Sequence, residues 1–140
     1  MKLVIIDGQG GRMGSLLVEK IKNSNFSDCE VYAIGTNSIA TAAMLKAGAG
    51  YGATGENPVI VNSRDADFII GPIGIMAADS LLGEVTPAMA VAVGQRGATK
   101  LLLSVNKGNY HDVGADNLTL GELVTQAVRD LNDFMNEENY

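Results

Sequence analysis

The chain is poor in the residues that build metal centres and disulfide frameworks. Its 140 residues include one cysteine, one histidine and no tryptophan. The single Cys29 cannot form an internal disulfide, and such sparse cysteine use is typical of a reducing compartment. Because no Cys or His cluster occurs at ligand spacing, the sequence also argues against a structural zinc site. We therefore expect no metal site and a fold stabilised by one compact apolar core.

Long apolar runs and clustered basic residues are missing as well. No stretch approaches the ~20 apolar residues that a membrane-spanning helix needs, and Met1 to Leu3 leads into an expected strand instead of a signal peptide. A net charge of −6 and a pI of about 4.6, without grouped Lys or Arg, argue against a nucleic-acid partner. These absences predict a cytoplasmic protein with neither a membrane nor a nucleic-acid partner.

What the sequence does have is a regular alternation of apolar, strand-like segments with amphipathic or capped ones. The expected strands cover residues 2–7, 29–35, 51–53, 67–70 and 100–105, and the expected helices begin near residues 12, 39, 58, 87 and 120. This alternation is typical of a parallel sheet with right-handed crossovers. We predict a single Rossmann-like α/β domain over residues 1–140, a three-layer sandwich with strand order 3-2-1-4-5.

Three short signals mark helix starts within this pattern. Asn57-Pro58 and Thr86-Pro87 each combine a cap residue with a proline suited to the first helical position. Before the last helix, Thr119 and Glu122 form a capping box. These signals predict helix starts at Pro58, Pro87 and Leu120.

A glycine-rich turn follows the first expected strand and precedes an amphipathic helix. Helix N-termini offer unpaired N–H groups and a positive dipole end, and glycines let the backbone approach an anion closely. The spacing fits Gly-x-x-Gly-x-x-Gly but misses the strict Gly-x-Gly-x-x-Gly, because Met13 stands at the third glycine's place. We predict a bound phosphate or pyrophosphate here, with the candidate ligand-binding residues Asp7, Gly8, Gly10, Gly11, Arg12, Met13 and Gly14.

Further candidates follow the other strands, because ligands of open parallel sheets bind outside the carboxyl ends of the strands, where strand order reverses. The turns there are small, polar or rich in glycine. They add five candidate ligand-binding residues, Thr36, Asn37, Gly71, Pro72 and Asn106. Turns between strands and helices also need such residues for purely structural reasons, and Asn37 in particular suits the cap of the next helix.

The acidic residue that usually holds a ribose in dinucleotide-binding folds is missing from its place. An Asp or Glu normally ends the second strand, where this chain has residues 35–37, Gly-Thr-Asn. Asp28 precedes that strand, so we expect it at the opposite edge of the sheet. NAD is therefore disfavoured as a cofactor, whereas Thr36, Asn37 and Ser38 together with Arg12 could receive the 2′-phosphate of NADP.

Asp7 is a carboxylate at the mouth of an expected anion site. It can orient glycine N–H groups, bind a ribose hydroxyl or a metal on phosphate oxygens, or oppose a phosphate by like-charge repulsion. The sequence leaves these roles open.

Candidates for catalysis are few. His111 and Lys107 lie with Tyr110 in the polar loop after the last strand, and such side chains suit general acid or base work near a cofactor. A lone histidine in a loop is more often merely solvated, so both residues are weak candidates.

The segment Ile73 to Leu82 is apolar although no strand is expected there. It is buried either by folding back on the core or by a partner chain. Because closed symmetric dimers are the commonest oligomers, we expect a homodimer formed through this loop or the final helix.

Two family resemblances rest on short stretches of the sequence. Gly11-Arg12-Met13-Gly14 resembles the cofactor loop of dihydrodipicolinate reductase, an NAD(P)H enzyme, over about the first 20 residues. That family has a separate substrate domain, for which 140 residues leave no room, so its activity is not carried over.

Over its whole length the chain resembles a bacterial family of small Rossmann-like proteins known as a domain of unknown function. The stretches that carry this resemblance are residues 6–11, 35–41, 52–57 and 71–75. It implies the fold and no activity.

These observations favour a nucleotide- or dinucleotide-binding module whose ligand is small and phosphorylated. One alternative is a small NADP-dependent oxidoreductase with an active site completed at a homodimer interface by residues 106–111. The other is a non-catalytic interaction protein in which the glycine turn is vestigial.

Overall fold

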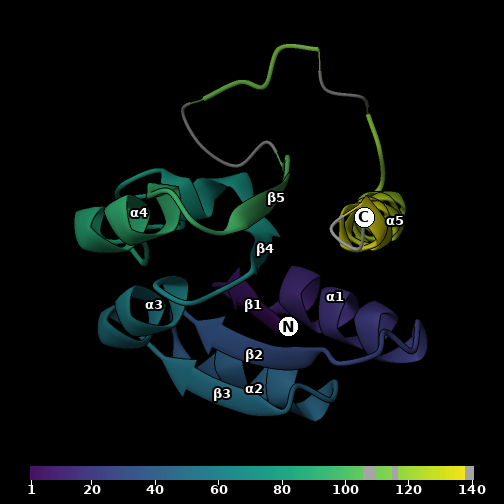
Figure 1. Cartoon of the computed structure of the whole chain (residues 1–140). Coiled ribbons are helices and arrows are strands. Elements are labelled where there is room, and N and C mark those ends of the chain that lie inside the picture. The colour runs from purple at the N-terminus through teal and green to yellow at the C-terminus, as the bar shows by residue number, and fades with distance from the viewer. Residues whose placement is uncertain (106–109, 115–116, 138–140) are drawn as a thin grey trace.

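A computed structural model describes residues 1–105, 110–114 and 117–137 of the chain. Their centre is a five-stranded parallel sheet of order β3-β2-β1-β4-β5 (Figure 1). Its strands are β1 (Lys2–Asp7), β2 (Glu30–Gly35), β3 (Tyr51–Thr54), β4 (Phe68–Pro72) and β5 (Thr99–Leu103). The predicted α/β fold class and strand order are confirmed.

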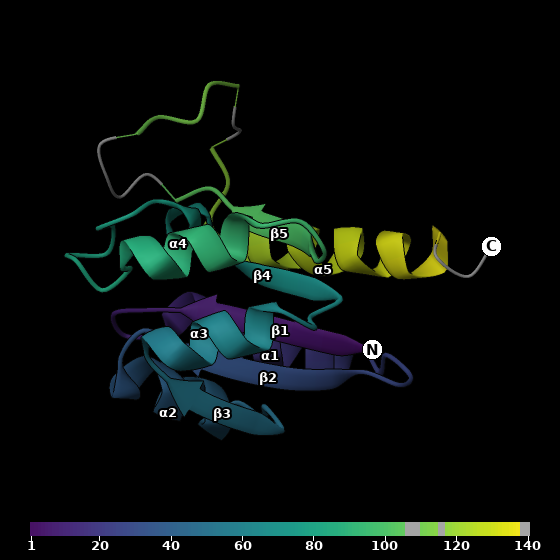
Figure 2. The same cartoon turned by 60° about the vertical axis from the view of Figure 1, so that its left-hand side comes forward.

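Helices cover both faces of the sheet. The helices are α1 (Arg12–Asn23), α2 (Ser38–Lys46), α3 (Glu56–Ser63), α4 (Pro87–Gly94) and α5 (Leu120–Glu137), with a short 3-10 helix, η1 (Ile73–Met76), after β4. Figure 2 shows α3 and α4 in front of the sheet and α1 and α5 behind it. The result is the three-layer arrangement predicted from the alternating pattern.

The central strand β1 is apolar from Leu3 to Ile6, between its two charged end residues, because helices cover both of its faces. Leu3 and Ile5 pack with the side chains of α1, α2 and α5. Val4 and Ile6 point the other way and pack with α3 and α4. Residues next to each other in β1 therefore belong to two cores, one on each face of the sheet, instead of the one compact core that the sequence predicts.

Two of the three helix starts lie where the sequence predicts them. The Thr86 hydroxyl caps α4 by accepting the Met89 amide at 3.2 Å. At the start of α5, the Glu122 amide donates to the Thr119 hydroxyl at 3.2 Å and the Thr119 amide donates to the Glu122 carboxylate at 3.3 Å. The capping box is thus formed as expected.

The predicted start of α3 at Pro58 is wrong. The helix begins at Glu56 behind Gly55, whose φ of 103° turns the chain directly after β3. Pro58 is then the third helical residue. A proline is tolerated there because the first N–H groups of a helix have no intrahelical partner to lose.

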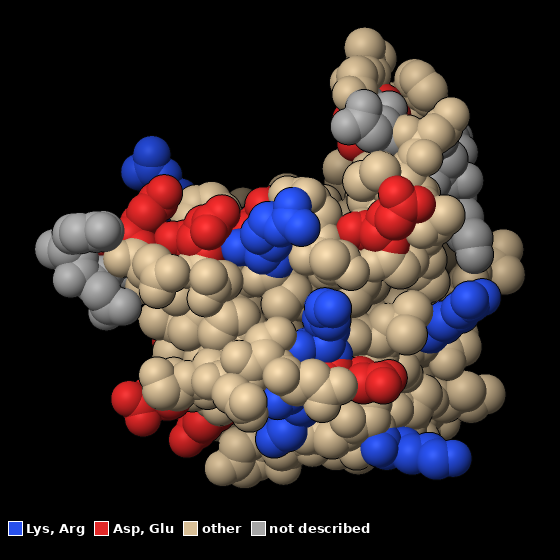
Figure 3. Space-filling view, turned by 90° about the vertical axis from the view of Figure 1, so that its right-hand side faces the viewer, with Lys and Arg blue, Asp and Glu red and all other residues tan. Residues whose placement is uncertain are grey.

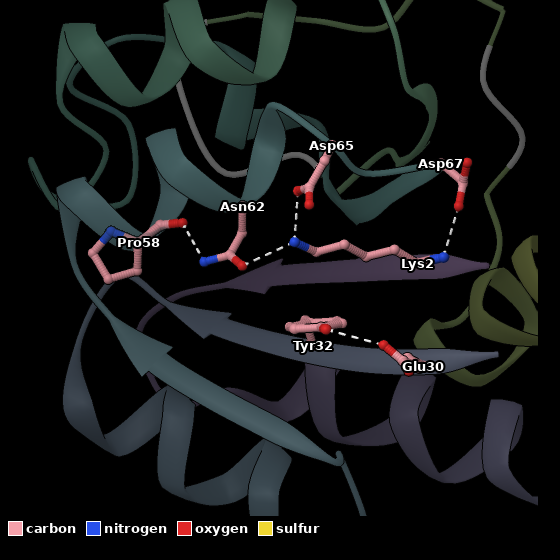
Figure 4. A network of polar contacts seen from close by, with 7 residues as sticks. All are labelled: Lys2, Glu30, Tyr32, Pro58, Asn62, Asp65 and Asp67. Atoms are coloured by element: carbon pink, nitrogen blue, oxygen red, sulfur yellow. Dashed lines mark hydrogen bonds and ion pairs between the residues drawn. The ribbon is translucent and has the colours of Figure 1, made fainter.

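A network at the amino ends of the strands fixes the edge of the sheet that lies opposite the glycine turn (Figure 4). Lys2 Nζ lies 2.6 Å from an Asp65 carboxylate oxygen and 3.1 Å from Asn62 Oδ1. The same ammonium group lies 4.4 Å from the centre of the Tyr32 ring, which stacks on Tyr51 at 4.5 Å. These contacts tie β1, β2 and β3 to the end of α3.

Asp28 also lies at this edge, as the sequence predicts. Its carbonyl accepts the terminal ammonium group of Met1 at 2.7 Å. Asp28 is therefore remote from the carboxyl ends of the strands and takes no part in a ligand site there.

Part of the apolar segment after β4 is buried by the chain itself. Ile75 is almost fully buried, and Leu81 packs against the core on the α3 and α4 side. Met76 and Leu82 remain exposed, Leu82 to 95%. This part of the segment is thus buried by folding back on the core, which is one of the two arrangements expected from the sequence.

Charges of both signs are interspersed on the face shown in Figure 3, where Lys and Arg side chains alternate with Asp and Glu.

Among the described residues, the helices are too short or too polar to cross a membrane.

Candidate functional site

The end of β1 is joined to the start of α1 by the carboxylate of Asp7. One of its oxygens accepts the Gly8 amide at 2.8 Å and the other accepts the Gly14 amide at 2.7 Å. The side chain is buried within the turn. Asp7 therefore orients N–H groups of the glycine turn, which is one of the roles that the sequence leaves open.

Two glycines of the turn are required by close packing against α2 and the end of β2. A Cβ on Gly8 would overlap the Thr36 hydroxyl. One on Gly11 would lie 2.7 Å from the Cα of Ala40, and the φ of 73° at Gly11 also disfavours a side chain. The fold itself explains both glycines.

Gly14 is also explained by packing, whereas Gly10 is not. A Cβ on Gly14 would overlap the sulfur of Met44 and lie 2.9 Å from the Asp7 Cβ. A Cβ on Gly10 would meet nothing within 4 Å, and its φ lies outside the left-handed region. No contact within the described part of the chain therefore requires a glycine at position 10.

The backbone N–H groups of the turn fall into two sets. Those of Gly8 and Gly14 bind Asp7, that of Gln9 donates to Glu84 at 2.9 Å, and that of Gly11 donates to the Gly8 carbonyl at 2.9 Å. The remaining set has no hydrogen-bond acceptor among the described residues and consists of the N–H groups of Gly10, Arg12 and Met13. Arg12 and Met13 begin α1 and Gly10 directly precedes its N-cap, Gly11, so the helix dipole adds to the attraction of these groups for an anion.

A cavity of about 190 Å³ opens beside this turn. It lies where strand order reverses, between the carboxyl ends of β1 and β4, which is the usual ligand position in such sheets. Its lining consists of Asp7, Gly8, Gln9, Gly10, Gly11, Arg12, Met13, Pro72, Leu81, Val105 and Leu120. Seven of the predicted ligand-binding residues are thus brought together around one small cavity.

On the β2 side of the turn, one carboxylate oxygen of Glu84 accepts three hydrogen bonds. The donors are the Gln9 amide at 2.9 Å, the Thr36 hydroxyl at 2.7 Å and the Asn37 side-chain amide at 2.7 Å. Burial of Glu84 opposes its ionisation, but these three bonds outweigh that effect and lower the pKa of the carboxyl. An ionised carboxylate therefore lies between the turn and the end of β2.

Thr36 and Asn37, which the sequence offers either for ligand binding or for a structural role, both bind within the chain. Asn37 is the N-cap of α2, because its side-chain oxygen accepts the Ala40 amide at 2.8 Å. Its side-chain nitrogen donates to the Gln9 carbonyl at 2.8 Å as well as to Glu84. The structural interpretation of Asn37 is thus confirmed, and both polar side chains are bound to a carboxylate of the same chain.

The other predicted site residues are scattered. Gly71 faces the backbone of β1, where a Cβ would overlap the Ile6 carbonyl, and so serves the sheet. Asn106 and Lys107 lie outside the described residues. His111 is exposed and makes no hydrogen bond or ion pair with another described residue.

The lining also contains residues that the sequence analysis missed. Leu81 from the η1–α4 loop, Val105 from the segment after β5 and Leu120 at the start of α5 help to enclose the cavity. Glu84, outside the lining, binds the turn. Their roles depend on how the segments after β4 and β5 fold back, for which periodicity gives no signal. A carboxylate directly before the buried Val85 is the only local hint of Glu84 in the sequence.

A larger hollow of about 600 Å³ runs along the polar side of α5. Its lining comes from that helix and the two residues before it, from Leu118 to Arg129. Because one helix supplies nearly all of this surface, the hollow is a groove on the outside of the fold. In the described part of the chain, no group of three or more potential metal-ligating side chains occurs.

Comparison with known families identifies the chain by sequence. The model of the family described as "Domain of unknown function (DUF3842)" matches residues 2–136. The chain therefore belongs to this family, in agreement with the resemblance noted over its whole length. None of the curated proteins matches the sequence.

Among solved structures, the chain is similar to a dodecameric FMN-dependent UbiX-like decarboxylase from Escherichia coli O157:H7. The identity is 16%, the TM-score is 0.49, and the match covers 94% of this chain and 77% of the other.

Proposed function

We propose that this member of the DUF3842 family binds a small phosphorylated ligand at the glycine turn. The phosphate would accept the N–H groups of Gly10, Arg12 and Met13, and the adjoining part of the ligand would occupy the cavity. The observation that carries this proposal is Gly10, whose missing side chain leaves open space that no part of the described fold uses.

The side chain of Arg12 fits the same role. It is exposed at the start of α1 and forms no ion pair or hydrogen bond with a described residue. A guanidinium group beside a phosphate forms charge-assisted hydrogen bonds that are about twice as strong as neutral ones. Arg12 therefore supplies the positive charge that an otherwise acidic chain needs at this position.

The size of the cavity limits the ligand. Pockets for drug-sized ligands and cofactors usually measure about 300 to 1,000 Å³, whereas this cavity measures about 190 Å³. A sugar phosphate, or the phosphate and sugar of a mononucleotide, suits this space better than a complete dinucleotide. Within the class of phosphorylated ligands, we therefore favour these two.

Thermal unfolding in the presence of candidate ligands tests the proposal. The probes are inorganic phosphate, ribose 5-phosphate, AMP, NAD and NADP. A ligand at 100 times its dissociation constant adds about 2.7 kcal/mol to the free energy of unfolding, which raises the Tm of a domain this size by several degrees. No shift with any probe would contradict the proposal.

A pair of glycine variants locates the site. Gly10→Ala places a methyl group in open space beside the proposed phosphate, and we expect it to lower the affinity for phosphate about tenfold. Gly50→Ala is the matched control, because its Cβ would make only an ordinary 3.7 Å contact just before β3. Equal affinities of the two variants would place the phosphate elsewhere.

The alternative of a small NADP-dependent oxidoreductase depends on His111 and Lys107. No observation on the described residues brings His111 to the cavity, so we do not favour this function. A turnover assay with NADPH and His111→Ala separates the two proposals, because a binding module has no turnover to lose.

The homodimer expected from the sequence stays a prediction. Leu82 is 95% exposed, and α4 exposes Val91 to 60% without a charged residue anywhere along the helix. Light scattering on the purified chain measures its mass directly. Twice the mass of one chain supports the dimer, and Leu82→Glu should then return it to the mass of one chain.

A further inference from the structure

The segment between η1 and α4 is a compact loop that closes on itself. The Asp79 amide donates to the Val85 carbonyl at 2.7 Å, and the Glu84 amide donates to the Leu81 carbonyl at 3.1 Å. Asp79, Leu81 and Leu82 have positive φ values of 67°, 55° and 56°, a conformation that costs roughly 1–2 kcal/mol for each such residue. The contacts of the loop must offset this cost, and the loop then holds Glu84 in one position.

Glu84 lies at the position where dinucleotide-binding folds hold a ribose. Those folds hold the ribose hydroxyls at the end of the second strand, beside the glycine turn. In this chain, the Glu84 carboxylate binds the turn through Gln9 and the end of β2 through Thr36 and Asn37. A carboxylate from another loop thus occupies the place of the ribose.

Space and charge at this place both oppose a dinucleotide. A Cβ built on Gly8 would lie 2.8 Å from a Glu84 carboxylate oxygen and 2.8 Å from Leu81 Cδ1. The side chains of Glu84 and Leu81 therefore occupy the space above Gly8 in which a sugar ring would lie. The 2′-phosphate of NADP would in addition lie beside a carboxylate whose pKa is lowered, so that like charges repel each other.

We infer that Glu84 determines the ligand class of the proposed site. It closes the ribose end of the turn, so that the site accepts a ligand with one phosphate-bearing end and rejects NAD and NADP. The inference rests on the proposed function, because it assumes that the open end of the turn, at Gly10 and Arg12, binds a phosphate.

A competing role for Glu84 predicts the opposite change in NAD affinity when the carboxylate is removed. Its second carboxylate oxygen could accept a ribose hydroxyl and so replace the acid that is missing from the end of β2. In that case removal of the carboxylate would weaken NAD binding. If Glu84 instead excludes the ribose, its removal strengthens the binding of NAD and NADP.

Calorimetric titration of wild type, Glu84→Ala and Glu84→Gln with ribose 5-phosphate, AMP, NAD and NADP distinguishes these roles. Wild type should bind ribose 5-phosphate or AMP and should bind NADP at least about tenfold more weakly. Glu84→Ala should gain about tenfold in NADP affinity relative to its affinity for the smaller ligand. Glu56→Ala is the matched control, since it removes an exposed carboxylate on α3 that accepts a single bond, from Thr86.

The conservative variant keeps the test decisive if Glu84→Ala fails to fold. Glu84→Gln keeps the shape and removes the charge, so the affinity for NADP should rise relative to that for NAD. An unchanged ratio in Glu84→Gln, or no gain in a folded Glu84→Ala, overturns the inference.

The remaining outcomes separate the inference from the proposed function. Wild type that binds NAD as well as AMP, with weaker NAD binding in Glu84→Ala, overturns the inference and leaves the proposed function standing. If no probe binds to any of the proteins, the proposed function fails and the inference fails with it.

Discussion

The Gly14 amide donates to the Asp7 carboxylate at 2.7 Å, and this bond ties the last residue of β1 to the first turn of α1. The second oxygen of the same carboxylate holds the Gly8 amide. Asp7 thereby fixes both ends of the glycine turn. The N–H groups between these ends, at Gly10, Arg12 and Met13, are the ones that have no acceptor in the described part of the chain.

Asp7→Asn should therefore destabilise the protein. An asparagine side chain can accept only one of the two backbone amides. Its NH₂ group then faces the other amide, so that one buried hydrogen bond to a charged group is lost and two donors face each other. Hydrogen bonds to charged groups contribute about 1.5–3 kcal/mol each, and we expect a loss of about 3 kcal/mol in urea unfolding. Asp133→Asn, on the exposed side of α5, is the control, and an equal effect of both changes would contradict this role of Asp7.

The Glu84 carboxyl should give the stability of the protein a defined pH dependence. Its pKa in the folded protein lies below its ordinary value of 4.5, so the folded state binds fewer protons than the unfolded state. The stabilisation is complete above pH 4.5 and is lost as the pH falls through the lower, folded-state pKa. Urea unfolding of wild type and Glu84→Gln should show the largest difference at neutral pH and a smaller one at pH values below 4.5, whereas a difference that grows on acidification would contradict the assignment.

Gly14→Ala and Gly10→Ala should differ sharply in stability. A methyl group on Gly14 overlaps the Met44 sulfur and approaches the Asp7 Cβ, whereas one on Gly10 meets open space. Overpacking of this kind costs about 1–3 kcal/mol, so we expect that loss for Gly14→Ala and less than about 0.5 kcal/mol for Gly10→Ala. Thermal unfolding of the two variants checks the difference, and a strongly destabilised Gly10→Ala would mean that the fold itself requires this glycine.

Lys2→Met should have only a small effect, despite the dense contacts around Lys2 in Figure 4. The side chain of its ionic partner Asp65 is 72% exposed, and exposed ion pairs contribute about 0–1 kcal/mol. Methionine keeps most of the aliphatic stem against Tyr32. We expect a loss of about 1 kcal/mol or less in urea unfolding, with Lys20→Met on α1 as the control, and a loss above about 2 kcal/mol would show that the network is a major source of stability.

The sheet could be predicted from the sequence because its signals are local and repeated. The apolar strands, Thr86 before Pro87, and the pair Thr119 and Glu122 each act within a few residues, and each lies where it was expected. The predicted start of α3 at Pro58 is wrong because Asn57-Pro58 is a good local cap signal, whereas the turn at Gly55 depends on how the chain leaves β3.

The candidate site was only partly predictable, for a related reason. The glycine turn and Asp7 are consecutive in sequence, so their proximity follows from the pattern alone. Glu84 reaches Thr36 across 48 positions of the chain, through a loop that depends on positive φ values at residues that rarely adopt them. Neither composition nor spacing indicates such a contact. The sequence therefore does not predict that the side chains of Thr36 and Asn37 bind Glu84.

The proposed site depends on one phosphate bound by the N–H groups of Gly10, Arg12 and Met13. Amide chemical shifts measured by NMR during titration with ribose 5-phosphate or AMP test it most directly. We expect the largest saturable shifts at Gly10, Arg12 and Met13, with much smaller shifts at Gly50 and the other residues at the amino ends of the strands. Saturable shifts that leave those three amides unchanged, or no saturable shift at all, would contradict it.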